Sequence, residues 1–319
     1  MLAKPGIQTI SPYQGGRPVE EVQRELGLTD VIKLASNENP LGPSKAALDA
    51  VADAAADVHF YPDGNAFYLR NAVADVHGVA PEQLIFGNGS SDVLQILGET
   101  FLSGGDHIVF PEQSFVVYSL IRDIFDARAA TPPLVDDTYD LTSLAAAVTA
   151  DTKLVFVANP NNPTGTYVTR DELDAFLDAV PRSALVVLDE AYFEYVEADD
   201  YPDGMEYLRA GRNVIVTRTF SKAYGLAGLR VGYGVASPDV VEMMNRARPP
   251  FNVNSLAQAG ALAALADTDH VSRSRAMNSE GMAYLTDSLS RLGLAHVPSV
   301  ANFLLVHLAR SGVEVTQAL

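Results

Sequence analysis

The segment from Thr219 to Arg230 holds the side chains of this chain that are best suited to chemistry. Two hydroxyl side chains, Thr219 and Ser221, come just before the amine of Lys222. Hydroxyls and a guanidinium bind phosphate well, and a lysine amine can form a Schiff base with a carbonyl. A ligand with both a phosphate and an aldehyde would use all of these groups, and pyridoxal 5′-phosphate is such a ligand.

Lys222 and Arg230 also have a simpler interpretation. A solvated loop lysine and a surface arginine in a salt bridge would give the same local sequence. The two interpretations differ in what they require elsewhere, because a bound cofactor needs partners from other segments of the chain. The positions of the remaining motifs therefore decide between them.

The composition limits the classes of partner and chemistry. The chain has 319 residues, of which 48% are hydrophobic, enough for a large domain and a smaller one. Its formal net charge of −18 argues against nucleic acid and anionic membranes as partners. The absence of cysteine excludes disulfides and thiolate catalysis, and the histidines lack metal-binding spacing, so we expect no metal. The sequence has no long apolar run and no signal-peptide pattern, so we expect a cytoplasmic protein.

Strand-like and helix-like segments alternate through the middle of the chain. Apolar runs rich in Val, Ile, Leu and Phe predict strands at 83–86, 107–110, 153–158, 184–189 and 213–217, and we expect a further strand at 127–130. Helical segments separate them, which predicts an α/β fold with a mostly parallel, doubly wound sheet. Ligands bind at the carboxyl ends of the strands in such sheets. Polar motifs begin there at Gly87, Asn159, Asp189 and Thr219, so we expect these segments to meet in one site.

The two ends of the chain predict a second, smaller α+β domain. Residues 1–42 give an N-terminal arm with a short strand beginning at Ile32, and residues 43–240 give the large domain that binds the cofactor. Residues 241–319 give linking helices and strands near 295–297 and 301–307. We expect this small domain to be truncated at its C-terminus, because the chain stops soon after the start of a new helix.

Three of the polar motifs suit parts of a phosphorylated ring cofactor. Two prolines and a glycine in 159–165 hold the amide of Asn162 on a rigid turn. Asp189 ends a buried strand, where a carboxylate needs a cation such as a pyridinium nitrogen, although a helix N-cap is the alternative. The glycine-rich turn before Ser90 and Ser91 offers backbone N–H groups to a phosphate, and a plain turn capped by serine is the alternative.

Taken together, these motifs resemble those of the fold-type I pyridoxal-phosphate aminotransferases. The resemblance covers nearly the whole chain and is carried by segments 36–42, 61–62, 87–90, 159–165, 189–192, 219–222 and 229–232. The segments from 159 onward, in this order and spacing, are typical of the superfamily. Segments 10–13 and 36–43 indicate the histidinol-phosphate aminotransferase family within it.

The resemblance implies catalytic and ring-binding roles for five residues. Lys222 forms a Schiff base with the cofactor and then moves the proton of the substrate. Asp189 pairs with the pyridine nitrogen, which keeps the ring protonated. Tyr192 and Asn162 hydrogen-bond the ring oxygen, and Phe115 stacks on the ring face.

The resemblance further implies contacts to the phosphate, the substrate and a partner subunit. A set of donors holds the phosphate: Ser90, Ser91, Thr219, Ser221 and Arg230. Tyr61 reaches the cofactor phosphate of the other subunit, so the expected assembly is a homodimer. Tyr13 and Asn39 lie in segments that line the substrate side.

The activity that the resemblance implies is transamination of histidinol phosphate in histidine biosynthesis, with 2-oxoglutarate and glutamate as the other pair. Members of the family carry substrate-binding arginines beyond the strand at 301–307, whereas Arg310 is the only arginine after Phe303 here, so we expect poor substrate affinity. Four alternatives remain open. They are an aromatic amino-acid aminotransferase, a decarboxylase of the threonine-phosphate type, a truncated chain that binds cofactor with little turnover, and a nucleotide-binding α/β protein.

Overall fold

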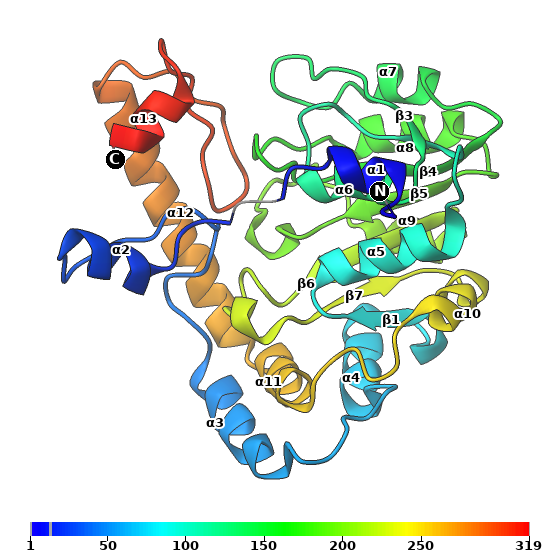
Figure 1. Cartoon of the computed structure of the whole chain (residues 1–319), viewed down its shortest axis with the longest axis horizontal. Coiled ribbons are helices and arrows are strands. Elements are labelled where there is room, and N and C mark those ends of the chain that lie inside the picture. The colour runs from blue at the N-terminus through cyan, green and yellow to red at the C-terminus, as the bar shows by residue number, and fades with distance from the viewer. Residues whose placement is uncertain (1, 13–14, 319) are drawn as a thin grey trace.

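The computed structural model describes residues 2–12 and 15–318, which contain one seven-stranded sheet (Figure 1). The strand order is β1-β7-β6-β5-β4-β2-β3. β7 is antiparallel to both of its neighbours, and the other pairs are parallel. The strands are β1 (Leu84–Gly87), β2 (His107–Val109), β3 (Arg128–Ala130), β4 (Thr152–Ala158), β5 (Leu185–Asp189), β6 (Val214–Thr219) and β7 (Gly232–Val235).

The three central strands are buried on both faces, because helices cover the sheet. Every residue of β5 and β6 is buried, as expected for Val- and Leu-rich strands of a parallel sheet. The sheet helices are α4 (Phe67–His77), α5 (Ser90–Phe101), α6 (Val116–Ile124), α7 (Leu141–Ala146), α8 (Arg170–Ala179), α9 (Gly204–Arg209) and α10 (Pro238–Ala247). α5 packs on β1, β6 and β7, and α9 packs on β6. The six predicted strands are therefore confirmed to within two residues, whereas β7 and α9 were not predicted.

The remaining helices extend away from the sheet. They are α1 (Pro5–Thr9), α2 (Val19–Leu26), α3 (Lys45–Ala54), α11 (Ser255–Ala266), α12 (Thr268–Arg291) and α13 (Gly312–Ala318). Figure 1 shows α12 running from α11 to α13, with α2 beside it and α3 packed against α11. α1 instead lies against α6 on the sheet side of the molecule. Short 3₁₀ helices complete the fold: η1 (Ala55–Asp57), η2 (Pro81–Gln83), η3 (Phe193–Tyr195) and η4 (Ala227–Leu229).

The predicted strands outside the sheet are wrong. The segment that begins at Ile32 is irregular, and the side chains of Ile32 and Leu34 are exposed to solvent. The segments near 295–297 and 301–307 pair only through an isolated bridge between His296 and Val306. Apolar residues at strand spacing form a regular strand only where a neighbouring segment continues the ladder of hydrogen bonds. Here Val297 N–H donates to the Leu305 carbonyl and His307 N–H to the Ala295 carbonyl, and the pairing stops at this single bridge.

A helix that crosses a bilayer needs about 20 predominantly apolar residues. In residues 2–12 and 15–318, no helix combines the length and the apolar character that a membrane crossing requires.

Candidate active site

A pocket of about 710 Å³ opens at the carboxyl ends of β1, β4, β5 and β6. β7 is antiparallel to β1 and β6, so the ends of these two strands lie at the same edge of the sheet. The loops that were predicted to converge therefore meet here. The predicted site residues that line the pocket are Ser90, Ser91, Phe115, Asn162, Asp189, Tyr192, Thr219, Ser221, Lys222 and Arg230.

Asp189 forms the buried acid at the floor of the pocket. Its carboxylate accepts hydrogen bonds from Tyr118 Oη at 2.8 Å and from Thr217 Oγ1 at 2.9 Å. Burial raises the pKa of Asp189, although these hydroxyls and the Ala191 N–H oppose the shift. Among the described residues, no cationic side chain forms an ion pair with Asp189. The pocket thus presents a desolvated carboxylate that a cationic ligand would stabilise.

Tyr118 is a site residue that the sequence did not indicate. It lies on α6, one turn after Phe115, is fully buried, and stacks on Phe156 with ring centroids 4.6 Å apart. The i, i+3 spacing of two aromatic residues in a helix is typical of ordinary core packing, so it carries no functional signal. Only the position of its hydroxyl beside Asp189 shows that Tyr118 acts on the site.

The part of the pocket that was predicted to bind phosphate lies where α5 begins. Ser90 is the first residue of α5, so its N–H and those that follow are free of helical partners. Gly232 is necessary because a Cβ there would lie 2.4 Å from Ser90 N. Gly89 has a φ of +90°, and a Cβ there would lie 2.6 Å from Arg230 Nη2. Close backbone and an adjacent guanidinium form a cradle for an anion.

The hydroxyls predicted for the same anion lie at the end of β6. Thr219 Oγ1 and Ser221 Oγ are 2.9 Å apart, and Ser221 N–H donates to Thr219 Oγ1 at 3.1 Å. Both residues are buried and line the pocket. These hydroxyls reach the pocket because Thr219 ends β6 and Ser221 follows it at the edge of the sheet.

Lys222 extends from β6 toward the N-terminal arm. Its Nζ donates to the carbonyl oxygens of Ser36 at 3.0 Å and Asn37 at 3.2 Å. Burial lowers the pKa of Lys222 to about 8, with Arg230 adding to the shift and Glu38 opposing it. At pH 7 about a tenth of this amine is therefore neutral, and hence nucleophilic, which is a few hundred times the neutral fraction of a lysine with the usual pKa.

Tyr192 lies between the two sides of the pocket. Its hydroxyl accepts from Asn162 Nδ2 at 3.4 Å and from Asn37 Nδ2 at 3.2 Å. Phe303 packs against its ring edge-on, with centroids 5.1 Å apart. Asn302 Nδ2 donates to the Asn37 carbonyl at 3.0 Å, which holds the arm in place. The arm residue Asn37 and the C-terminal residues 302–303 were not predicted as parts of the site.

Two further predicted residues, Asn39 and Tyr61, do not line the pocket. Asn39 is buried outside the pocket lining, and its amide donates to the Ala223 carbonyl at 2.9 Å and to Ser274 Oγ at 2.8 Å. Tyr61 is 82% exposed and stacks on Phe251, away from the pocket of its own chain. Tyr13 lies outside the described residues. Asn39 therefore acts on the pocket through the residue next to Lys222.

The chemistry of these groups fits pyridoxal 5′-phosphate. Asp189 offers a buried negative charge to a pyridinium nitrogen, and the turn at Gly89 offers N–H groups to a phosphate. Lys222 offers a partly neutral amine to an aldehyde. A solvated loop lysine would have neither the buried position nor the lowered pKa, so that interpretation of Lys222 is excluded.

Comparison with known proteins agrees with this geometry. A family model described as aminotransferase class I and II matches residues 29–319. The histidinol-phosphate aminotransferase of Moorella thermoacetica is 54% identical over 98% of this chain and 81% of its own length. This chain belongs to the histidinol-phosphate aminotransferase family.

Two further comparisons extend this result. Histidinol-phosphate aminotransferase 1 of Nitrosococcus oceani is 48% identical over 100% of this chain and 86% of its own length. The crystal structure of histidinol-phosphate aminotransferase from Sinorhizobium meliloti in complex with pyridoxal 5′-phosphate has a TM-score of 0.89 at 32% identity, covering 97% of this chain and 83% of that one. The predicted fold class, enzyme class and cofactor are thereby confirmed: the protein is a fold-type I aminotransferase that uses pyridoxal 5′-phosphate.

Proposed function

We propose that this aminotransferase interconverts histidinol phosphate and imidazole acetol phosphate, with 2-oxoglutarate and glutamate as the other pair. The single observation that carries the transamination chemistry is the meeting of Asp189, Lys222 and the turn at Gly89 in one pocket. The choice of amino substrate rests on the similarity to histidinol-phosphate aminotransferases at 48–54% identity over nearly the whole chain.

Four residues of this chain are proposed to act on the reacting part of the cofactor and substrate. Bound pyridoxal 5′-phosphate supplies a ring that withdraws electrons from the amino substrate. Asp189 holds a proton on the ring nitrogen, since a buried carboxylate is stabilised by a positive partner. The Lys222 amine takes and returns the proton of the substrate carbon, for which a pKa of about 8 suits neutral pH. Tyr192 and Asn162 hold the ring oxygen.

Other residues are proposed to anchor the cofactor and to exclude water from the pocket. Ser90, Ser91, Thr219, Ser221 and Arg230 hold the phosphate, and Phe115 covers the ring face. Asn37 and Phe303 close the pocket above Tyr192, which favours proton transfer to the substrate over exchange with water.

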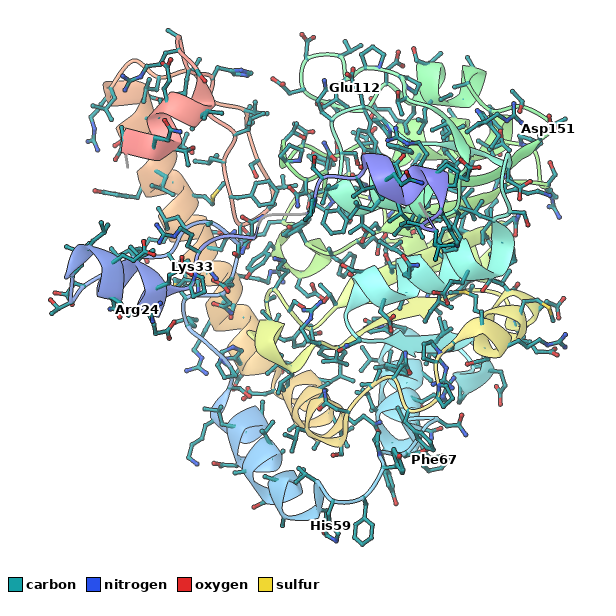
Figure 2. All side chains as sticks on the ribbon, viewed as in Figure 1. Arg24, Lys33, His59, Phe67, Glu112 and Asp151 are labelled. Atoms are coloured by element: carbon teal, nitrogen blue, oxygen red, sulfur yellow. The ribbon has the colours of Figure 1, made fainter. Side chains whose placement is uncertain are left out.

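A second copy of the chain is part of the proposed enzyme. The connection between α3 and α4 exposes Phe60 at 65% and Tyr61 at 82%, and Phe67 and Phe251 beside it are also exposed. Figure 2 shows Phe67 and His59 pointing outward from the rim of the molecule. Aromatic residues grouped in this way favour burial against a partner. We infer a homodimer in which Tyr61 serves the site of the partner subunit.

The test is the rate of glutamate formation by the purified enzyme with 2-oxoglutarate and a series of amino donors. We expect histidinol phosphate to be used with a higher kcat/KM than phenylalanine and tyrosine, because the chain is 48–54% identical to histidinol-phosphate aminotransferases over nearly its whole length. Equal or higher values for the aromatic donors would replace this proposal with an aromatic aminotransferase. Release of carbon dioxide from threonine phosphate would replace it with a decarboxylase.

A further inference from the structure

The side of the sheet opposite the pocket carries a buried charged group directly behind the cofactor site. Residues of β6 alternate, so Thr217 and Thr219 point toward the pocket whereas Arg218 points to the opposite side. Arg218 is only 2% exposed. Burial lowers its pKa, but Glu190, Tyr233 and Asp203 together raise it above the ordinary arginine value, so the guanidinium remains charged.

Arg218 binds two carboxylates from two different elements. Its Nε and Nη2 donate to Glu190 Oε2 at 2.9 and 2.7 Å, and Nη2 also donates to Asp203 Oδ1 at 2.7 Å. Its guanidinium lies 3.4 Å from the centre of the Phe193 ring. Arg218 therefore joins β6 to the residue that follows β5 and to the residue that caps α9.

Glu190 is fixed on its other side as well. Its Oε1 accepts the N–H of Gly204 at 2.7 Å, and a Cβ on Gly204 would lie 2.5 Å from that oxygen. Its own N–H donates to the Thr217 carbonyl at 2.9 Å. Glu190 thus has directional bonds to β6 and to the start of α9, and it is covalently next to Asp189.

A contribution to folding stability does not by itself account for this group of three charged side chains. Removing charges from water is costly, and apolar residues of similar volume often stabilise a protein as well or better. Directional bonds differ from apolar packing because they fix the relative position of the elements they join. The elements joined here carry Asp189 on β5 and Thr219 on β6, which face the pocket from the opposite side of the same strands.

We propose that Arg218, Glu190 and Asp203 form a positioning network that fixes the spacing between Asp189 and Thr219. This inference rests on the proposed function, in which Asp189 binds the ring nitrogen and Thr219 the phosphate of one cofactor. A rigid ligand held at both ends gains full affinity only when both anchors are at the correct separation. A ligand held at one end does not depend on that separation.

The test compares pyridoxamine 5′-phosphate with pyridoxamine, which lacks the phosphate. Neither has an aldehyde, so neither bonds covalently to Lys222, and the fluorescence of each reports its dissociation constant on the cofactor-free enzyme. The dissociation constant of pyridoxamine divided by that of pyridoxamine 5′-phosphate measures how much the phosphate contact adds to the affinity when the ring is also bound. The variants are Arg218→Lys, which keeps the charge, and the double variant Arg218→Met with Glu190→Gln, which leaves no unpaired charge between that pair. Arg170→Met is the matched control, because Arg170 pairs with Glu206 of α9 at the surface.

We expect the ratio to fall at least about tenfold in both network variants, whereas pyridoxamine alone binds with less than about a threefold change, and Arg170→Met changes neither constant. Equal losses for both ligands, an unchanged ratio, or failure of both variants to fold would overturn the proposal, since the network would then serve stability only. A wild-type enzyme that binds the two ligands equally would instead refute the proposed cofactor contacts themselves.

Discussion

The hydroxyl of Tyr118 donates a 2.8 Å hydrogen bond to the Asp189 carboxylate from the side of the sheet covered by α6. Thr217 donates the second one from the neighbouring strand. The acid that is proposed to hold the ring nitrogen therefore depends on two neutral hydroxyls. Both favour the ionised form of a carboxyl whose burial raises its pKa.

Replacing Tyr118 with Phe removes one of these hydroxyls without changing the ring. We expect the pKa of Asp189 to rise further and the affinity for pyridoxal 5′-phosphate to fall about ten- to hundredfold, since a hydrogen bond to a charged group contributes about 1.5–3 kcal/mol. Fluorescence titration of the cofactor-free enzyme measures the affinity. Tyr139→Phe is the control, because Tyr139 is also buried but its hydroxyl contacts Ser114. Equal effects of the two variants would refute a specific role for Tyr118.

Lys222 should react as an amine with a pKa of about 8 rather than the usual 10.5. A lysine is nucleophilic only when neutral, so a lowered pKa moves the onset of reactivity to lower pH. We expect trinitrophenylation of Lys222 in the cofactor-free enzyme, followed by peptide mass spectrometry, to reach half its maximal rate near pH 8. Lys45, whose side chain is exposed, reports the intrinsic pH dependence of the reagent in the same sample. A shared midpoint for the two lysines would contradict this prediction.

Gly232→Ala should damage the phosphate cradle. The added Cβ would lie 2.4 Å from Ser90 N and 3.0 Å from the Arg218 carbonyl, both of them backbone atoms that cannot rotate away. We expect a loss of about 1–3 kcal/mol in the free energy of unfolding, measured with urea, and weaker cofactor binding. Gly228→Ala, where a Cβ would meet no protein atom within 4 Å, should leave the free energy of unfolding unchanged. A stable Gly232→Ala enzyme with full cofactor affinity would show that the loop tolerates displacement.

Tyr61 should act on the site of the partner subunit. We expect Tyr61→Ala and Lys222→Ala enzymes each to have little activity alone. Unfolding and refolding the two together should restore up to about a quarter of the wild-type activity, because half of the dimers are mixed and each mixed dimer has one complete site. Wild-type enzyme taken through the same procedure calibrates recovery. A mixture no more active than the sum of its parents would refute the shared site.

The alternation of strands and helices along the sequence predicted which loops would meet in the pocket. Asp189, Thr219 and Lys222 each end or follow a buried strand, and parallel strands bring their carboxyl ends to one edge. The sequence could not predict Tyr118 or Arg218, because a buried tyrosine in a helix and an arginine within a strand give no sign of what their polar atoms contact. Asn39 has the same difficulty, because the direction of its side chain depends on α12, through Ser274.

The carbonyl oxygens that hold Lys222 come from residues 36 and 37, far from it in the sequence. In this scaffold an exchange of the first forty residues would also replace the arm residues that line the pocket around Lys222, among them Glu38, whose charge raises the pKa of this amine. Chimeras made in this way should therefore be screened for a shifted pH optimum before any change in turnover is attributed to substrate recognition.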